Sequence, residues 1–286
     1  MTDALHRASA PEESVQGGER GRGGLKVVIT GASSGLGHAL ATELASRCPG
    51  STFLLLGRRT ERLAELASQL PPGTLTSFES VDVSDHLAIR AVSERFMAQH
   101  GVPDIVIASA GISAGTLTDE PEDRAVFAKV FAVNVQGMYD TFAPFVAPMR
   151  QAGRGTLVGI ASVAGVRGLP GSGAYSGSKA AVSAYLESLR VELHGTGVSV
   201  VTISPGFIDT EMTRGNPYRM PFLMPAEQFA RRAVDAIRAR RRRVVIPWQM
   251  GCVAMLLRVL PAWLFDRLFA QAGRKPRQPG LGRSGD

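Results

Sequence analysis

The sequence predicts an α/β protein in which a doubly wound, Rossmann-type parallel sheet is flanked by helices. Short β-branched runs recur from residue 25 onward, stretches with apolar residues at helical spacing separate them, and a glycine-rich segment follows the first run. Strands that are apolar throughout are covered on both faces, and their alternation with helices is typical of parallel crossover units. No linker or change of composition divides residues 25–246, so we expect one domain there.

Six apolar runs are predicted to be the strands of this sheet: LKVVIT from Leu25, TFLLLG from Thr52, DIVIAS from Asp104, TLVGIAS from Thr156, VSVVTIS from Val198 and RVVIP from Arg243. A seventh strand is predicted at LTSFESVDV from Leu75, which is more polar. Stretches such as RLAELASQL and AIRAVSERFMA lie between them and have helical spacing. Right-handed crossovers bring the carboxyl ends of the strands to one edge of the sheet, where we expect the ligand to bind.

The composition argues against several other classes of protein. Cys48 and Cys252 form no CxxC pair and no disulfide framework, which favours a reducing compartment such as the cytoplasm. Five scattered histidines without a close His/Cys cluster predict no metal site. Residues 1–24 hold no apolar stretch, so we expect a flexible extension rather than a signal peptide, and we expect a flexible tail at residues 279–286.

The strand-to-helix turn after the first strand is written TGASSGLG. Gly31 permits a tight turn, Gly35 lets the backbone approach a pyrophosphate, and Gly37 lets the following helix pack closely on the strand. The helix is expected to begin around Ser34, with the N–H groups of its first turn facing the phosphates. Taken alone, these glycines also fit an ordinary strand-to-helix turn. Their spacing, G-x-x-x-G-x-G, resembles that of the short-chain dehydrogenase/reductase family, of the classical type.

The end of the second strand predicts the cofactor. A carboxylate there would bind the ribose hydroxyl of NAD, but this chain has Gly57 followed by Arg58 and Arg59. A guanidinium suits a 2′-phosphate, so NADP(H) is favoured over NAD(H), with Arg58 as the first contact. The resemblance adds the Ser33 hydroxyl on the same phosphate. A solvated helix N-terminus is the alternative interpretation.

Further cofactor contacts are implied by the resemblance. Asp82 and Val83 resemble the family's pair at the adenine ring, although a helix cap is the alternative from the residues alone. Residues 108–111 read ASAG where the family commonly has Asn-Asn-Ala-Gly, so the hydrogen bonds of those asparagines do not carry over. Pro205 and Gly206 form a rigid turn, and Thr210 resembles the hydroxyl that holds the nicotinamide carboxamide. The complete set of predicted contacts is Gly31, Ser33, Ser34, Gly35, Leu36, Gly37, Arg58, Asp82, Val83, Ala110, Gly111, Tyr175, Lys179, Pro205, Gly206, Ile208 and Thr210.

The segment GAYSGSKAAV carries the predicted chemistry. Tyr175 and Lys179 are four positions apart and share a helix face, so the ammonium is expected to lower the pKa of the phenol toward the working range. Ser162 lies 13 residues earlier at the end of the TLVGIAS strand, on the edge expected to bind ligand. The order Ser…Tyr-x-x-x-Lys matches the family's catalytic pattern, and Asn134 matches its fourth member. For Asn134, a surface-facing position on an amphipathic helix is the alternative.

The resemblance implies an oxidoreductase that transfers a hydride between NADP(H) and a ketone or aldehyde, or the corresponding secondary alcohol. Ser162 would bind the carbonyl oxygen, Tyr175 would donate the proton, and both would contact the substrate. Lys179 would contact the nicotinamide ribose, and Asn134 would support a water chain. A non-catalytic NADP(H) sensor or scaffold is the alternative of another class. The family also implies a homodimer or homotetramer built on the helices that bear Asn134 and Tyr175.

Residues 214–225, RGNPYRMPFLMP, are predicted to form a mobile lid over the substrate. Its side chains Met220, Phe222, Leu223 and Met224 offer an adaptable apolar surface, which favours an apolar substrate.

Residues 247–278 are predicted to be an apolar, basic helical extension. Residues 238–286 hold 11 basic and 2 acidic residues, so the charge of +7 originates in this region. Its apolar part is too short to span a bilayer. Three interpretations remain open: a lid or dimer-packing element, an interfacial helix over residues 247–270 on the inner face of an anionic membrane, or a nucleic-acid surface. The second would suit a lipid or sphingoid ketone reductase, with Trp248, Trp263, Phe265 and Phe269 as anchors. The third has least support because aromatic residues are not interleaved with the arginines, and we expect no nucleic-acid partner.

Overall fold

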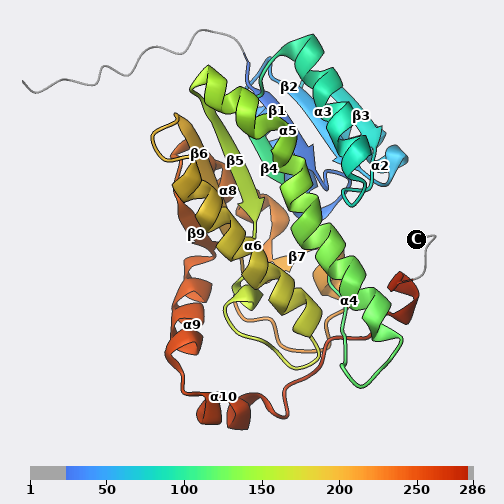
Figure 1. Ribbon diagram of the computed structural model, residues 1–286, viewed down its shortest axis with the longest axis vertical. Helices are drawn as coiled ribbons and strands as arrows, with labels where there is room; N and C mark the ends of the chain where they lie inside the picture. The colour runs from blue at the N-terminus through green and yellow to red at the C-terminus, as the bar shows by residue number, and fades with distance from the viewer. Residues whose placement is uncertain (1–23, 283–286) are drawn as a thin grey trace, which may run out of the picture.

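A computed structural model describes residues 24–282, which form a three-layer α/β domain with a C-terminal extension (Figure 1). Most of the expected N-terminal extension, residues 1–23, and residues 283–286 of the expected tail lie outside the described part. The sheet is parallel throughout, with the strand order β3-β2-β1-β4-β5-β6-β9. Its strands are β1 (Lys26–Thr30), β2 (Thr52–Gly57), β3 (Leu75–Ser80), β4 (Ile105–Ala108), β5 (Gly155–Ile160), β6 (Val198–Pro205) and β9 (Arg243–Ile246). The predicted fold class and all seven predicted strands are confirmed.

Helices cover both faces of the sheet. One face carries α1 (Gly35–Arg47), α2 (Thr60–Gln69) and α8 (Ala226–Arg238), and the other carries α3 (His86–His100), α5 (Gly137–Ala152) and α6 (Gly173–Glu192). Further elements are α4 (Asp123–Phe131), η1 (Ala132–Gln136), η2 (Val163–Gly165), β7 (Ile208–Asp209), α7 (Glu211–Arg214), β8 (Met224–Pro225), α9 (Trp248–Val259), α10 (Ala262–Phe269) and η3 (Pro279–Gly282). The segment η1 is π-helical and joins α4 to α5 in one long rod.

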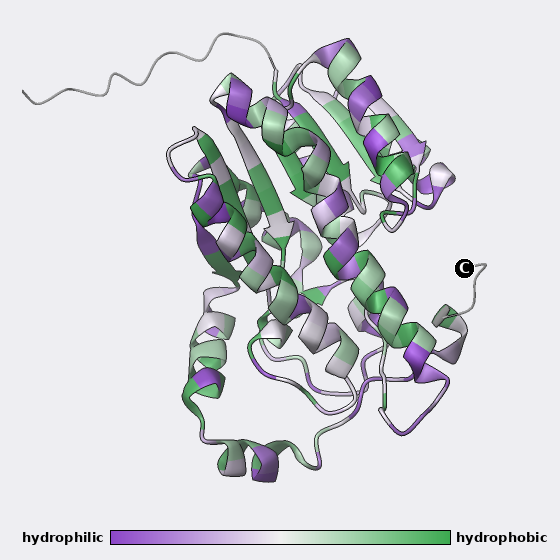
Figure 2. Cartoon of the chain, viewed as in Figure 1, coloured by the Kyte–Doolittle hydropathy of each residue, from purple (hydrophilic) through white to green (hydrophobic). Residues whose placement is uncertain are grey.

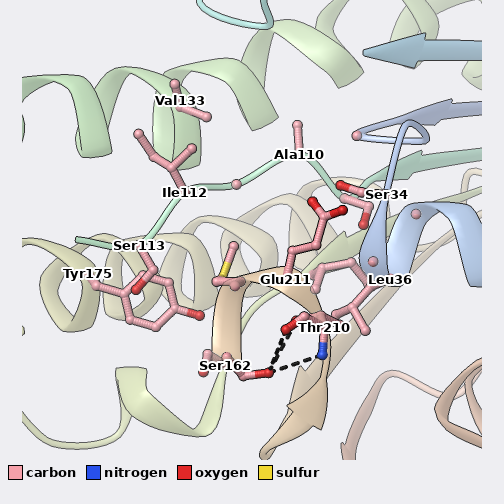
Figure 3. Close-up of a pocket in the computed structure, with 18 of the residues that line it drawn as sticks. Ser34, Leu36, Ala110, Ile112, Ser113, Val133, Ser162, Tyr175, Thr210 and Glu211 are labelled. Atoms are coloured by element: carbon pink, nitrogen blue, oxygen red, sulfur yellow. Dashed lines mark hydrogen bonds between the residues drawn. The ribbon is translucent and has the colours of Figure 1, made fainter. Parts of the chain in front are cut away.

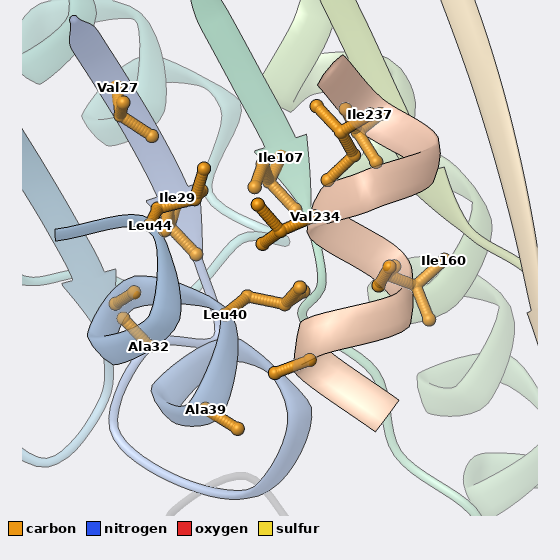
Figure 4. Close-up of a cluster of buried hydrophobic side chains, with 14 of the residues drawn as sticks. Val27, Ile29, Ala32, Ala39, Leu40, Leu44, Ile107, Ile160, Val234 and Ile237 are labelled. Carbon is orange, nitrogen blue, oxygen red and sulfur yellow. The ribbon is translucent and has the colours of Figure 1, made fainter. Parts of the chain in front are cut away.

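Two hydrophobic clusters hold these layers together. Alternate residues of β1 point to opposite faces, so Ile29 joins the cluster under α1 and α8, whereas Val28 joins the cluster under α3, α5 and α6. In the first cluster, Leu40 of α1 meets Val234 of α8 over the middle of the sheet (Figure 4). Because both sides of these strands are covered, they are mostly green in Figure 2, and polar residues gather on the outer helix faces. The strand β3 is more polar because it is less well covered. It lies at the edge of the sheet, and its Leu75 is 61% exposed.

The strand order reverses between β1 and β4, so consecutive crossovers leave this point in opposite directions. A crevice opens at such a reversal beyond the carboxyl ends of the strands, here after Thr30 and Ala108. This topology fixes the place of the candidate site.

The C-terminal extension is helical only as far as Phe269. Residues 270–278, which we call the C-terminal strap, run back to the carboxyl edge of the sheet without forming a helix (Figure 1). The prediction of a helical extension through residue 278 therefore needs correction. Backbone pairing between Gly115 and Arg277 holds the strap against the loop after β4. No helix among the described residues is long and apolar enough to cross a bilayer.

Candidate active site

A cavity of about 600 Å³ lies at the carboxyl edge, above the reversal of strand order (Figure 3). Every residue predicted to contact the cofactor lines it, and so do Ser162, Tyr175 and Lys179. These residues come from the loops that follow β1, β2, β3, β4, β5 and β6, and from α6. Gly31 and Thr210, 179 positions apart in the chain, thus line the same cavity because the strands are parallel.

The glycine-rich turn forms a closely packed backbone cradle at one end of the cavity. Gly31 has a φ of 71°, and a Cβ atom there would lie 2.7 Å from the backbone of Ala110. A Cβ atom at Gly37 would lie 2.3 Å from the carbonyl oxygen of Gly31, so α1 packs directly on the turn. Ser34 is the N-cap of α1, and the first turn of the helix contains no acidic residue. Backbone N–H groups and the positive end of the helix dipole therefore face the cavity, which fits a bound pyrophosphate.

The Ser109 hydroxyl is a second feature that fits a bound dinucleotide. Its oxygen is buried without a hydrogen-bond partner among the described residues, and Ser109 lines the cavity. Buried hydroxyls are normally paired, so this oxygen is suited to a polar group of a bound molecule.

The basic residues after β2 lie at the same end of the cavity. Arg58 and Arg59 both line it, and Arg59 forms an ion pair of 3.1 Å with Glu211 and donates to the carbonyl oxygen of Ser33 at 3.4 Å. A Cβ atom at Gly57 would lie 3.0 Å from the hydroxyl of Ser33, so this hydroxyl and the arginines converge. The sequence showed no motif that links Glu211 to this cluster.

Asp82 lines the cavity with its carboxylate already engaged. Partial burial raises the pKa of this carboxyl, but hydrogen bonds from the Ser84 hydroxyl and amide and an ion pair of 3.1 Å with Lys129 outweigh that effect and lower the pKa to about 2. The residue therefore stays ionised and holds the loop after β3 in place, beside Val83.

Ser162, Tyr175 and Lys179 form the chemical centre of the cavity. Ser162 follows β5 and caps η2, while Tyr175 and Lys179 are one turn apart on α6. Lys179 is buried, and its ammonium donates to the carbonyl oxygen of Ile160 at 2.8 Å, 6.0 Å from the Tyr175 ring centroid. Burial lowers the pKa of Lys179 to about 8.

The expected lowering of the tyrosine pKa is not found in this arrangement. Burial raises the pKa of Tyr175, and the hydrogen bond with Ser162 only partly opposes that effect. The physical reason is that burial removes water from the phenol, while the Lys179 ammonium donates its hydrogen bond to the carbonyl oxygen of Ile160. Tyr175 is therefore neutral at physiological pH and able to donate a proton.

Asn134, the predicted fourth catalytic residue, does not line the cavity. It is fully buried in η1, where its side chain accepts from the Ile112 amide at 2.8 Å and donates to the Ile112 carbonyl and to the Ser178 hydroxyl. The surface-facing alternative is thereby excluded. The side chain therefore ties the segment after β4 to α6.

The predicted lid needs a second correction. Met224 belongs to β8, pairs with Ile208 and is only 5% exposed in the core under α8, so it offers no surface to a substrate. Met220, Phe222 and Leu223 do not line the cavity, whereas Met212 of α7 and Asn216, which follows this helix, do. The irregular sequence of this loop contained no signal for which side chains face inward.

The C-terminal strap and η3 form part of the cavity wall. A lid was one interpretation of residues 247–278, but the sequence did not identify which of them would line the cavity. The lining residues from this region are Lys275, Pro276, Gln278 and Leu281. No motif or periodicity marks these residues in the sequence, and only the return of the chain to the carboxyl edge brings them there.

The fold and the cavity define a dinucleotide-binding protein of the oxidoreductase type. The sequence matches the short chain dehydrogenase family over residues 25–219. It is 39% identical to an uncharacterized oxidoreductase of Myxococcus xanthus over 84% of this chain and 94% of that one. Two solved structures at 25% identity have the same fold, and the match to each covers 78% of this chain and 95% of the other chain. One is an alcohol dehydrogenase of Thermococcus sibiricus complexed with 5-hydroxy-NADP, with a TM-score of 0.69. The other is an L-sorbose reductase of Gluconobacter frateurii complexed with NADPH and L-sorbose, with a TM-score of 0.70. The chain belongs to the short-chain dehydrogenase family.

Proposed function

We propose that this protein is an NADPH-dependent reductase of ketones or aldehydes, able to oxidise the corresponding secondary alcohols in reverse. The observation that carries the proposal is the convergence of Ser162, Tyr175 and Lys179 in the wall of the cavity that also contains the glycine cradle. A non-catalytic sensor or scaffold is less well supported, because binding a dinucleotide does not require a serine, a tyrosine and a lysine at one end of the site.

In the proposed reaction, the residues of the chain would bind the carbonyl oxygen of the substrate and donate a proton to it. A bound dihydronicotinamide supplies the hydride. The Ser162 hydroxyl donates a hydrogen bond to the carbonyl oxygen of the substrate, and Tyr175 transfers the proton of its phenol to the same oxygen. Lys179 stabilises the phenolate that forms, and the phenolate of Tyr175 then regains a proton from solvent. The raised pKa of Tyr175 keeps the phenol protonated before the carbonyl group is reduced.

The preference for NADP(H) rests on the cluster at the end of β2. A 2′-phosphate would meet the charge of Arg58 and the hydroxyl of Ser33. Position 57 is a glycine, so the carboxylate that would bind the ribose hydroxyls of NAD is absent. The two solved relatives complexed with NADPH or 5-hydroxy-NADP support the same cofactor.

The substrate that we propose has an apolar body. Ile112, Met212 and Leu281 line the cavity together with Tyr175, and they offer apolar contact around a reacting carbonyl group. This keeps lipid and sphingoid ketones among the candidates.

The helices α9 and α10 favour a second, peripheral role at a membrane surface. They are anchored by Arg167, which donates to the carbonyl oxygens of Leu257 and Leu260 and stacks on the Phe265 ring at 4.3 Å. Their outer face is apolar, with exposed side chains Trp248, Met255, Leu256, Val259, Trp263 and Leu268. Such a face beside arginines suits an anionic interface, consistent with a cytoplasmic protein that contacts the inner leaflet. Replacing Trp248 and Trp263 by Ser should abolish sedimentation with anionic vesicles, and unchanged sedimentation would exclude this contact.

We also propose that the chain forms a homodimer or homotetramer through the outer faces of α4, α5 and α6. Phe127 and Val191 are 46% and 62% exposed there. Large apolar side chains on neighbouring helices favour burial against a second copy. Light scattering that gives the mass of a monomer would exclude this arrangement.

The central test is NADPH oxidation with a panel of ketones, with NADH in parallel. Tyr175→Phe should lower the rate of reduction by at least about a hundredfold and leave NADPH binding intact, because only the proton donor is lost. Tyr139→Phe is the matched control, since Tyr139 is 57% exposed on α5 and does not line the cavity. Equal activity of the two variants, or NADPH binding without turnover of any carbonyl compound, would contradict the proposal.

A further inference from the structure

The C-terminal strap is held in place by several independent contacts. The carbonyl oxygen of Pro276 accepts a hydrogen bond of 2.9 Å from the Gly115 amide. Arg277 donates to the carboxylate of Asp123 at 2.9 Å and forms an ion pair of 3.0 Å with Glu120. Asp123 is only 2% exposed, and its hydrogen bond from Arg277 lowers the pKa of this carboxyl. A buried carboxylate paired with an arginine anchors the strap firmly.

The approach of the strap to the loop after β4 is too close for a side chain at position 115. A Cβ atom at Gly115 would lie 2.2 Å from the carbonyl oxygen of Lys275. The glycine therefore permits a contact that brings the residue at position 275 to the substrate end of the cavity.

The side chain of Lys275 reaches the centre of the site. Its ammonium donates to the hydroxyl of Ser113 at 2.6 Å and lies 5.5 Å from the centroid of the Tyr175 ring. Lys179 lies 6.0 Å from the centroid of the same ring, so the reacting phenol has two ammonium groups beside it. Lys275 and Ser113 both line the cavity, and Ser113 is 9% exposed.

No carboxylate among residues 24–282 pairs with Lys275. Its hydrogen-bond partner is a neutral hydroxyl, unlike Lys129, which has Asp82, and Arg277, which has Asp123. Burial lowers the pKa of Lys275 to about 8, so the side chain remains mostly charged at neutral pH. A partly desolvated cation that faces a cavity without a counter-charge favours an anionic group on whatever binds there.

We propose that Lys275 is a specificity-determining residue that selects carbonyl substrates bearing a carboxylate, held by its ammonium and by the Ser113 hydroxyl beside Tyr175. The inference rests on the proposed reductase function and narrows its substrate class to oxo acids with an apolar chain. The apolar lining by Ile112, Met212 and Leu281 accommodates the chain, and Lys275 supplies the charge at the reacting end. The strap thus takes part in recognition of the substrate.

Binding of a matched pair of probes tests this inference without turnover. With the enzyme saturated with NADP+, decanoate and decanamide are titrated by calorimetry; they differ in charge and share the chain. We expect decanoate to bind more tightly by on the order of 10- to 100-fold, as for a charge-assisted hydrogen bond in a partly desolvated site. Lys275→Met should abolish the preference. Arg274→Met is the control, because Arg274 is the exposed neighbour on the same strap, carries the same charge and does not line the cavity.

The pH dependence separates a charge effect from a structural one. Since Lys275 is charged below its pKa of about 8, the preference for decanoate should be complete at pH 7 and fall as the pH rises through that value. Lys275→Arg should retain the preference at pH 9, because a guanidinium remains protonated there. A variant that merely loosened the strap would weaken both probes equally at every pH.

Kinetics links the inference to the reaction. A series of C10 oxo acids, with the ketone at different distances from the carboxylate, is compared with the corresponding methyl esters as NADPH-dependent substrates. The ratio of kcat/KM for acid over ester should fall at least about tenfold in Lys275→Met and remain unchanged in Arg274→Met. Equal binding of decanoate and decanamide by the wild type, or a preference that survives in Lys275→Met, would overturn the assignment of Lys275. If neither this series nor any other carbonyl compound is reduced, the proposed function fails, and the calorimetric comparison still decides what Lys275 recognises.

Discussion

Replacing Asn134 by Ala tests the most buried polar contact of the site. The side chain is 0% exposed and makes three hydrogen bonds, of 2.8 and 3.0 Å to the backbone of Ile112 and of 2.9 Å to Ser178. Two of them are partly buried and one is fully buried. A hydrogen bond contributes about 0.5–1.5 kcal/mol and a buried group left without a partner costs about 1–3 kcal/mol, so the free energy of unfolding should fall by about 2–5 kcal/mol.

The assay is urea denaturation of the protein without cofactor, followed by steady-state kinetics. Activity should also fall, because Ile112 lies between Gly111 and Ser113, and all three line the cavity. Gln136→Ala is the control, since Gln136 is exposed in the same π-helical segment, and its effect should stay within about 0.5 kcal/mol. Equal stability of the two variants would refute the reasoning, and a loss of activity in Asn134→Ala without loss of stability would show that the side chain acts directly in the reaction.

Three further predictions concern the cofactor end of the cavity. Arg58→Ala should raise the KM for NADPH by on the order of 10- to 100-fold and leave that for NADH within about twofold, because the 2′-phosphate, which NADH lacks, loses a charged partner. An equal rise for both cofactors in initial-rate measurements would contradict the role of Arg58. Gly37→Ala should lower both the melting temperature and the affinity for NADPH, since its methyl group would lie 2.3 Å from the Gly31 carbonyl oxygen, and an unchanged melting temperature would disprove the close packing. Asp82 has a folded-state pKa of about 2, below its ordinary 3.8, so its ionised carboxylate stabilises the fold above about pH 4 and this contribution is lost as the pH falls toward 2. Denaturation should therefore show Asp82→Asn less stable than the wild type at neutral pH and the gap shrinking below pH 4, whereas a gap independent of pH would exclude this account.

Much of the cofactor site could be predicted because its signals are local. The turn around Gly31 and Gly37 has to be written in consecutive residues, since steric limits act between neighbours in the chain and between a helix and the strand before it. The spacing of Tyr175 and Lys179 is set in the same way by one helical turn. These residues line one cavity because strands that alternate with helices are parallel, which is a consequence of the alternating pattern itself.

The substrate side could not be predicted in the same manner. The prediction that the apolar residues of the lid face the substrate was wrong for Met224. Whether this side chain faces a ligand or the core depends on the pairing of β8 with β7. Each of these strands has only two residues, which is too few to show a periodic pattern in the sequence. The pKa of Tyr175 was also misjudged, because spacing predicts that an ammonium is near but does not predict burial of the phenol or the carbonyl group of Ile160 that binds Lys179.

The amino-acid sequence by itself determined the fold class, the seven strands of the sheet and the glycine turn that lines one end of the cavity. These features could be predicted because backbone sterics and helical periodicity act over a few residues. Only the tertiary structure decided that Asn134 points into the protein and that Lys275 meets Ser113 and Tyr175. The physical reason is that such contacts join segments as much as 162 positions apart. Their formation depends on where the whole chain packs, and no short stretch of sequence encodes it.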